Sequence, residues 1–553
     1  MNAAILFEPD GYLLTGPRLM GRQAAGNGFL RAAVQGRADR PVTAFTPFRS
    51  SAEAFHRAVA EIDPAAPTHW IPGQRLDLLA EVGLLYRPDQ VLGPAARQRL
   101  RVGPAAYSLC GVTHTLATHT TLDAIARIPA EPVMPWDALI CTSTTARAVV
   151  TAVLDRQADY ARWRTGQAPL VERPLLPVIP LGVHCADFAF TEAERVAARQ
   201  ALGLEGEAIA VLSAGRLSLG GKAHPYATLR ALQQTAEATG KTLVLVLAGQ
   251  AHNAAIAQAF QSAVKAFCPA VRTVFVDGKD PAAYRGAWAG ADLFISLADS
   301  IQETFGITPV EAMAAGLPAL VSDWNGYRDT VRDGEDGFRI ATWAPPPGDG
   351  AAIAHDYEIG LADYEHYLSR SNTAVAVDMR QLTARLRALV TDPGLRRRLG
   401  EAGRARARST FDWSVVFAGY QALWDEQTAI RLKALADPAT GPWLARAPTS
   451  GADHMGPFDT FASYPTRHVA ADTWVARASD LTPEGYRELI AQQILALWPL
   501  APQIVDRVLA ALQAGPSTVA DLARATALPP ERMTEIVARL AKIDVVMLSP
   551  EPW

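Results

Sequence analysis

Short apolar runs alternate with longer amphipathic stretches over the first 185 residues. The runs at residues 3–7, 106–110, 138–141 and 177–180 have the length and composition of buried strands, and a helical pattern begins at Phe29. A glycine-rich stretch from Gly21 to Gly28 separates the first strand from that helix. Such alternation predicts a parallel sheet with helices on both faces.

The alternation starts again after Asp187. An apolar run at 209–213 leads into a glycine-rich turn and a helical pattern at 226–239. Further strand-like runs follow at residues 242–248, 271–276, 292–296 and 318–322. The expected fold class is therefore α/β, with two doubly wound Rossmann-like domains at residues 1–186 and 187–430. Two such domains would place a ligand cleft between them, opposite the carboxyl ends of the strands.

The C-terminal part of the chain has a different pattern. Residues 431–480 are rich in Pro, Gly, Thr and Ser but also carry aromatic residues, which predicts an extended, ordered strap. The segment 481–553 is expected to form a small helical domain that resembles a winged helix-turn-helix module. Its predicted elements are helices at 481–498, 501–514, 518–526 and 530–542 and a strand at 545–548.

Composition narrows the class of protein only a little. The 553 residues are 49% hydrophobic and 20% charged, with a formal net charge of -4, which gives no global attraction to nucleic acid or to an anionic membrane. The four cysteines lack C-x-x-C spacing, which fits a reducing compartment and argues against a zinc site. Residues 1–12 lack the basic region of a signal peptide, so we expect a cytoplasmic protein.

The segment 299–318 carries the most chemical information. A polar loop follows the strand at 292–296, and Thr308, Pro309 and Glu311 fit a capping box at the start of a helix. The free N–H groups of that helix start would bind phosphate. A capping box explains Glu311 but does not explain Glu303 in the preceding loop. Two carboxylates beside an anion site suit a ligand that has hydroxyl groups as well as phosphates.

This segment resembles retaining glycosyltransferases of family 4, which have the GT-B fold. Glu303 and Glu311 match the E-x7-E signature of those enzymes, and residues 311–318, 322–331 and 334–338 continue the match. The resemblance implies that Glu311 binds the ribose hydroxyls and that Glu303 binds the hydroxyls of the donor sugar. It also implies that the sugar and phosphates are lined by the backbone of Phe305, Gly306, Ile307 and Thr308.

The glycine-rich turn at 213–222 contains two basic residues, Arg216 and Lys222. Such residues on a loop are usually only solvated. Beside a diphosphate site they would instead form a cationic clamp on the leaving group. The turn resembles the Gly-Arg-Leu … Lys-Gly element of family 4, although the spacing between the two basic residues is one residue longer. Because no convincing Asp-x-Asp pair follows a strand, we expect no metal and no cofactor.

The N-terminal half offers weaker candidates. Gly28 ends a glycine-rich stretch that could lie near the donor phosphates or could be an ordinary βα turn. His114 follows the strand at 106–110, and the resemblance implies that it faces the reacting sugar, whereas an isolated histidine is more often structural. Residues 178–184 resemble the inter-domain hinge of the family.

The function that the resemblance implies is transfer of a sugar from a nucleotide-sugar donor to a glycan, lipid-linked or protein acceptor, in cell-surface polysaccharide biosynthesis. A lipid-linked acceptor would bring the protein to the inner face of the membrane. A sugar-nucleotide epimerase or a sugar phosphorylase would share the fold. We find no recognisable epimerase pattern, and no context for the lysine that holds pyridoxal phosphate in a phosphorylase.

The alternative from another class is a DNA- or protein-binding regulator with a degenerate GT-B body and the C-terminal domain as reader. Residues 501–553 carry five basic and six acidic residues, a net charge of -1, and two of the acidic residues lie on the predicted recognition helix, Glu531 and Glu535. That balance disfavours contact with phosphates. The C-terminal domain is therefore interpreted as a module for a protein partner or for homo-oligomerisation.

Overall fold

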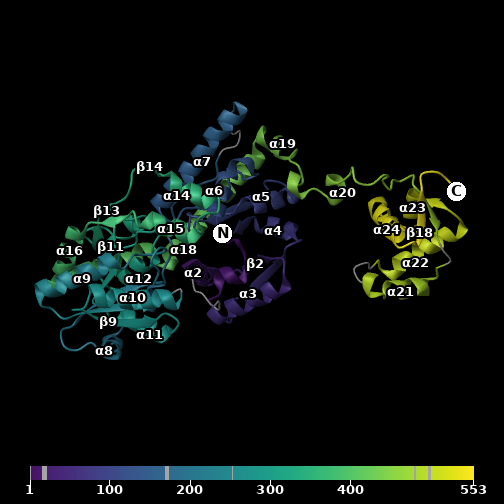
Figure 1. The fold of residues 1–553 in the computed structure, drawn as a ribbon. Helices are drawn as coiled ribbons and strands as arrows, with labels where there is room; N and C mark the ends of the chain where they lie inside the picture. The colour runs from purple at the N-terminus through teal and green to yellow at the C-terminus, as the bar shows by residue number, and fades with distance from the viewer. Residues whose placement is uncertain (1, 15–20, 168–172, 252, 479–480, 496–499) are drawn as a thin grey trace. The chain divides into compact units, whose positions relative to one another are not determined.

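The structure, a computed structural model, describes residues 2–14, 21–167, 173–251, 253–478, 481–495 and 500–553. The chain divides into two compact units, Met1–Gly451 and Ala452–Trp553 (Figure 1). No helix within the described ranges is long and apolar enough to cross a membrane.

The first half of the larger unit is a six-stranded parallel sheet in the order β3-β2-β1-β4-β5-β6. Its strands are β1 (Ala4–Leu6), β2 (Val42–Thr46), β3 (Thr68–Pro72), β4 (Leu84–Tyr86), β5 (Ser108–Val112) and β6 (Ala138–Ile140). The helices that connect and cover them are α1 (Pro9–Tyr12), α2 (Gly21–Gln35), α3 (Arg49–Ile62), α4 (Leu76–Val82), α5 (Gly93–Arg99), α6 (His119–Ala126) and α7 (Thr144–Thr165). This is the doubly wound arrangement that the alternating pattern predicts.

The second half repeats the architecture with the sheet order β12-β11-β10-β7-β8-β9. Its strands are β7 (Ile209–Ala214), β8 (Leu243–Gly249), β9 (Arg272–Asp277), β10 (Leu293–Ser296), β11 (Ala319–Ser322) and β12 (Gly337–Ile340). Its helices are α8 (Glu192–Ala201), α9 (Tyr226–Thr239), α10 (Ala254–Phe267), α11 (Pro281–Gly290), α12 (Ile307–Ala315), α13 (Tyr327–Thr330), α16 (Met379–Thr391) and α17 (Pro393–Arg406). The predicted fold class, two doubly wound domains in one chain, is confirmed.

A small insertion separates β12 from α16. It consists of β13 (Thr342–Trp343), β14 (Pro347–Gly350), α14 (Ala351–Glu358), α15 (Tyr364–Asn372) and β15 (Ala376–Val377). Strands β13 and β15 pair with each other and lie outside the main sheet.

Two local predictions about the first domain are wrong. The glycine-rich stretch Gly21–Gly28 is not a turn, because it forms the first two turns of α2. The run at 177–180 forms only an isolated bridge, Cys141 to Val178, beside the edge strand β6. Both errors have the same cause, since a short apolar or glycine-rich run does not by itself reveal which neighbour it will contact.

The long helix α18 (Trp413–Ala436) returns from the second domain to the first. Its buried residues recur at helical spacing and pack against residues of β1, β2, β4, β5 and α2 in one core; they are Trp413, Val416, Phe417, Tyr420, Leu423 and Trp424. The two crossings between the domains also pair, since Val183 exchanges backbone hydrogen bonds with Phe411 and Trp413. The helix therefore belongs by packing to the first domain, although the sequence places most of it in the second.

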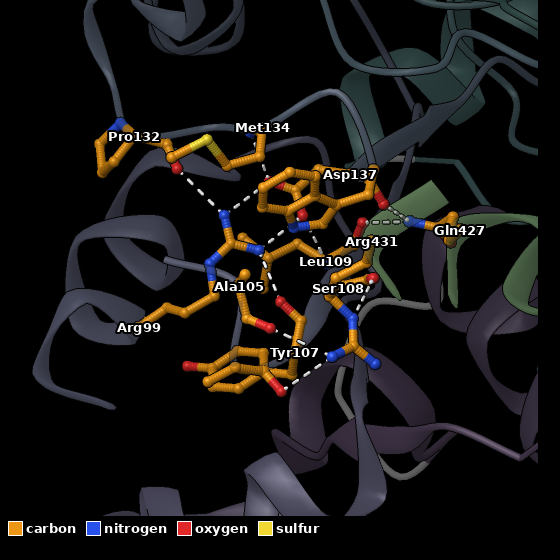
Figure 2. Close-up of polar contacts among 12 residues, drawn as sticks. Arg99, Ala105, Tyr107, Ser108, Leu109, Pro132, Met134, Asp137, Gln427 and Arg431 are labelled. Atoms are coloured by element: carbon orange, nitrogen blue, oxygen red, sulfur yellow. Dashed lines mark hydrogen bonds and ion pairs between the residues drawn. The ribbon is translucent and has the colours of Figure 1, made fainter. Parts of the chain in front are cut away.

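A buried polar network fastens α18 to the first domain (Figure 2). Arg99 and Asp137, both fully buried, form a two-pronged ion pair at 2.6 and 2.8 Å. From α18, Gln427 donates to the carbonyl oxygens of Leu109 and Trp136. The two terminal nitrogens of Arg99 and the amide nitrogen of Gln427 each donate to a carbonyl or carboxylate oxygen, which lowers the cost of burying these groups.

The smaller unit has a three-stranded sheet in the order β17-β16-β18. Its elements are β16 (Trp474–Arg477), α21 (Pro483–Ile490), α22 (Pro502–Ala511), β17 (Ser517–Thr518), α23 (Val519–Thr526), α24 (Pro530–Lys542) and β18 (Val546–Ser549). Between α18 and this sheet lie the short helices α19 (Thr440–Leu444) and α20 (Pro457–Thr460).

The strap expected at 431–480 therefore differs from the structure at both ends. Its first residues continue α18, and its last residues form the central strand β16 of the small sheet. The helix expected at 481–498 is also shorter, because α21 ends at Ile490 and a single 3-10 turn follows at Gln493–Leu495. Residues 496–498 of that prediction lie outside the described residues.

Candidate functional site

The N-terminus of α12 forms one wall of the site. The helix begins at Ile307, its N-cap is Gly306 at φ 85°, and no side chain caps it. The predicted capping box, with Thr308 as the cap and Glu311 closing it, is therefore wrong. A Cβ at position 306 would lie 1.9 Å from a ring carbon of Tyr327, so glycine is required both by the left-handed backbone and by this contact.

Tyr327 holds this helix start in place. Its hydroxyl lies 2.8 Å from Ser296 Oγ at the end of β10, and it also hydrogen bonds with Thr308. Phe305, just before the helix, is buried in the core of the second domain, and Ile307 packs against the same core. The four residues 305–308 are thus fixed by packing, with the first free N–H groups of α12 at the carboxyl end of the sheet.

Glu303 and Lys222 form an ion pair beside this helix start. Lys222 Nζ lies 2.7 Å from Glu303 Oε2, and the side chain of Glu303 is only 10% exposed whereas that of Lys222 is 41% exposed. Burial alone would raise the pKa of Glu303. The positive charge of Lys222 and hydrogen bonds from backbone N–H groups outweigh burial and hold the pKa below its ordinary value. Glu303 is therefore a stable anion that neutralises a lysine.

Glu311 has the opposite electrostatic environment. It lies one turn into α12, and burial raises its pKa to about 7, an effect that the more distant charge of Lys222 only partly offsets. The hydroxyl of Tyr284, on α11, lies within electrostatic reach of this carboxyl. The two carboxyls of the E-x7-E pattern are thus separated in pKa by their surroundings, because only Glu303 has a cation in contact.

Arg216 lies on the loop after β7 and points to the same region. Its Nη2 donates to Gln302 Oε1 at 3.0 Å, and Gln302 directly precedes Glu303. A cleft at the carboxyl ends of β7 and β10 is bordered by Arg216, Lys222, Ser296, Thr308 and Tyr327. This cleft thus has two cations and one helix N-terminus on its walls, which is an arrangement suited to a diphosphate.

The first domain contacts the Glu303 loop through the start of α7. Ser143 caps α7 and also donates its hydroxyl to the carbonyl oxygen of Thr304 at 2.7 Å. The next residue, Thr144, donates its backbone N–H and its hydroxyl to the carboxylate of Asp329. The helix N-terminus of one domain is therefore bound by a carboxylate of the other, which the helix dipole favours.

His114 and Gly28 have packing roles in the structure. The ring Nε2 of His114 donates to the carbonyl oxygen of Pro88 at 2.9 Å, and burial lowers the pKa of this histidine to about 4, so the ring is neutral. Gly28 lies inside α2, where a Cβ would come within 2.5 Å of the indole nitrogen of Trp413. That contact accounts for glycine at position 28, and any role of either residue towards a donor stays a prediction.

Of the residues predicted in the second domain, Arg216, Lys222 and Thr308 line one cleft, and Glu303 joins them through its ion pair with Lys222. Glu311 is not among the residues that line the cleft, and those predicted in the first domain do not join it through a described contact. Several residues at the site were not singled out from the sequence: Gln302, Tyr327, Asp329, Ser143 and Tyr284. A usable signal existed for Ser143 alone, because serine before an apolar helical pattern marks an N-cap. The others are identified only by tertiary contacts.

Comparison with known proteins finds similarity to glycosyltransferases. The family model described as glycosyl transferases group 1 matches residues 194–345, from α8 to the insertion. Phosphatidyl-myo-inositol mannosyltransferase of Mycobacterium leprae (strain TN) is 42% identical over 81 residues, which are 14% of this chain and 20% of the relative. The protein of the same name from Mycobacterium tuberculosis (strain ATCC 25618 / H37Rv) is 35% identical over 104 residues, 18% of this chain and 27% of the relative.

The aligned segments of this chain therefore cover only 20% and 27% of the length of these two curated relatives. Among solved structures, a glycosyltransferase from Rickettsia africae ESF-5 is similar in fold, with a TM-score of 0.50 and 10% identity. That similarity covers 77% of this chain and 98% of the other. It supports the two-domain fold, and the match to the family model lies in the domain that carries Glu303 and Glu311.

Proposed function

We propose that this chain is a nucleotide-sugar-dependent glycosyltransferase of the retaining family 4 type that works without a metal ion. The observation that carries the proposal is the grouping of Arg216, Lys222, Glu303 and the N-terminus of α12 around one cleft. The similarity of residues 194–345 to glycosyl transferases group 1 supports the same chemistry, because this segment contains all four features.

Each group has a role that follows from its charge and position. Glu311, whose pKa burial raises to about 7, would accept hydrogen bonds from ribose hydroxyls. Glu303, whose pKa is lowered, would accept them from hydroxyls of the donor sugar. The N–H groups at 307 and 308 and the side chains of Arg216 and Lys222 face the diphosphate. These two side chains and the helix terminus supply the positive charge that a divalent cation would otherwise supply.

The reaction step that we propose breaks the bond between the anomeric carbon of the sugar and the diphosphate oxygen. The acceptor hydroxyl forms its new bond on the face from which the diphosphate leaves, and its proton passes to an oxygen of that diphosphate. The negative charge that develops on the leaving group is stabilised by Arg216 and Lys222. No side chain is required as a general base in this scheme.

The acceptor is proposed to be a glycan, a lipid-linked sugar or a protein, in keeping with polysaccharide or glycolipid assembly. The names of the mycobacterial relatives support an acceptor of the glycolipid kind. The smaller unit, whose helices and three-stranded sheet fit a winged-helix module, is proposed to bind a protein partner or a second copy of the chain.

The proposal is tested by thermal stabilisation with a panel of UDP-, GDP-, ADP- and dTDP-sugars in the presence of EDTA. We expect one nucleotide to stabilise the wild-type protein and to stabilise the Glu311→Gln variant far less. Transfer by the selected donor is then followed by NMR, where the anomeric signal of the product should have the donor configuration. An inverted product, or binding that EDTA abolishes, would contradict the retaining, metal-independent mechanism.

A further inference from the structure

The insertion between β12 and α16 connects the first domain with the loop that carries Arg216 and Lys222. Its two helices, α14 and α15, are joined by the ion pair of Arg370 with Asp356 and by stacking of Tyr357 on Tyr367, with ring centroids 4.7 Å apart. They therefore act as one rigid body, although they lie in a connection outside the main sheet.

The C-terminal end of α15 contacts the loop of residues 215–222, which carries Arg216 and Lys222 and is called the cation loop below. The buried amide of Asn372 donates to the carbonyl oxygen of Leu219 at 2.9 Å and to Asp299 Oδ1 at 3.3 Å. A Cβ on Gly220 would lie 2.3 Å from Ser369 Oγ, so the backbone of the loop and α15 are in the closest contact that glycine allows. Movement of α15 would therefore move the loop.

The other end of the helical pair contacts the first domain. The ring of Tyr357 contacts the rings of His119 and Tyr367, with centroid distances of 3.8 and 4.7 Å. The hydroxyl of Tyr364 approaches Thr115 Oγ at 3.5 Å. Tyr357 thus contacts one ring of the first domain and one ring of α15. The aromatic residues of the insertion are a contact between domains.

Tyr364 also connects to the site itself. Its hydroxyl lies close enough to Gln302 to interact with it electrostatically, and Gln302 accepts from Arg216. A line of polar contacts thus runs from Thr115 in the first domain through Tyr364 and Gln302 to the guanidinium group of Arg216.

We infer that α14 and α15 form an interdomain clasp, through which contact with the first domain holds Arg216 and Lys222 in position, and that Tyr364 is a positioning residue for Arg216. The purpose of the clasp rests on the proposed function, because it would couple domain contact to stabilisation of the leaving group. Its geometry does not rest on that function and is testable without any substrate.

The first test is hydrogen–deuterium exchange of the full-length protein without ligand. Tyr357→Ala removes the ring between the two domains, and we expect exchange in residues 213–223 to rise about two- to ten-fold, the range that loss of one or two aromatic contacts gives. Leu361→Ala is the matched control, since Leu361 is 75% exposed in the same helical connection, and should leave the loop unchanged. Faster exchange confined to residues 351–372 would overturn the clasp.

The second test uses Tyr364→Phe, which removes a single oxygen and leaves no cavity. With the donor found by the panel of nucleotide sugars, we expect kcat to fall about ten-fold while the donor KM changes less than about two-fold, because positioning acts on the transition state. Equal changes in both constants, or none, would remove Tyr364 from the role. If the panel finds no donor, the proposed function fails, and the exchange experiment still decides whether the clasp exists.

Discussion

Replacement of Glu311 by glutamine should stabilise the ligand-free protein at alkaline pH. The carboxyl has a pKa of about 7 in the folded protein because it is buried, against 4.5 for an ordinary glutamate. Below pH 4.5 the group is protonated in both the folded and the unfolded chain. Between pH 4.5 and 7 only the folded chain keeps the proton, so the free energy of unfolding falls as the pH rises. Above about pH 7 the free energy of unfolding has fallen by the full amount and changes no further through this group.

The size of this loss follows from the two pKa values. A gap of about 2.5, at about 1.36 kcal/mol per unit, makes the ionised carboxyl about 3 kcal/mol destabilising at pH 8 and about 1 kcal/mol at pH 5.5. Glutamine has the same shape and no charge, so Glu311→Gln should recover these amounts. For a domain of this size the gain corresponds to a rise in Tm of about 6–12 °C at pH 8 and about 2–4 °C at pH 5.5.

The assay is differential scanning calorimetry of wild type and variant at both pH values. Glu303→Gln is the matched control, because Glu303 belongs to the same signature but has a lowered pKa and an ion pair with Lys222. Its stabilisation is present above the pKa of the unfolded chain and is lost as the pH falls through the folded value. Glu303→Gln should therefore lower Tm at pH 8. If Glu311→Gln lowers Tm at pH 8, or shifts it equally at both pH values, the argument from burial is refuted.

Four further predictions concern charged groups of the site, of the core and of the contact between the domains. Arg216→Ala should lower kcat about 100-fold with a smaller change in donor affinity, as measured by steady-state kinetics; unchanged turnover would exclude it from leaving-group stabilisation. Donor binding at pH 7 should release protons from Glu311, which is measured by calorimetry in buffers of different ionisation enthalpy. Asp137→Ala should cost about 3–5 kcal/mol in urea unfolding because it leaves the charge of Arg99 buried and unpaired. Asp329→Asn should weaken the contact between the domains and speed exchange at the start of α7.

The sequence was sufficient where neighbours along the chain carry the signal. The apolar runs identified three of the six strands of the first sheet and five of the six strands of the second, whereas β2, β3, β4 and β12 were not predicted. Glu303, Glu311, Arg216 and Lys222 lie within short motifs. Strands of a parallel sheet end at the same edge, so residues that follow β7 and β10 must come close together. The grouping of Lys222 with Glu303, 81 positions apart, is a consequence of that topology.

The capping box shows where a local pattern misleads. Thr308, Pro309 and Glu311 have the residue types and the spacing of such a box. The helix nevertheless begins two residues earlier, because Gly306 adopts a left-handed conformation that no other residue would accept beside Tyr327. Thr308 then interacts with Tyr327, and Glu311 does not close a capping box. The contact that decides between the two starts comes from residue 327 and cannot be read from the motif.

Contacts between the two domains could not be predicted from the sequence, because the residues that form them are far apart along the chain. The hydroxyl of Ser143 and the carbonyl of Thr304 are 161 positions apart, and α18 packs its aromatic face on strands that lie more than 300 positions earlier. Gly28 illustrates the consequence, because its lack of a side chain is explained by Trp413 on that returning helix. Amphipathic periodicity identifies a buried face but not the surface that covers it.

The opposite pKa directions of Glu303 and Glu311 suggest why the signature needs two carboxylates at this separation. A loop residue before the helix can contact Lys222 and stay ionised, so it would fix a cation next to the proposed leaving group at physiological pH. Glu311, inside the first turns of α12, is farther from that cation, and burial raises its pKa to about 7. Hydroxyl groups of a ligand would then restore the charge that burial disfavours. Glu303 would therefore be ionised before the ligand binds, whereas Glu311 would become fully ionised only when ligand hydroxyls bind to it. Removal of Lys222 should raise the pKa of Glu303 towards that of Glu311, so that the two carboxyls no longer differ in ionisation.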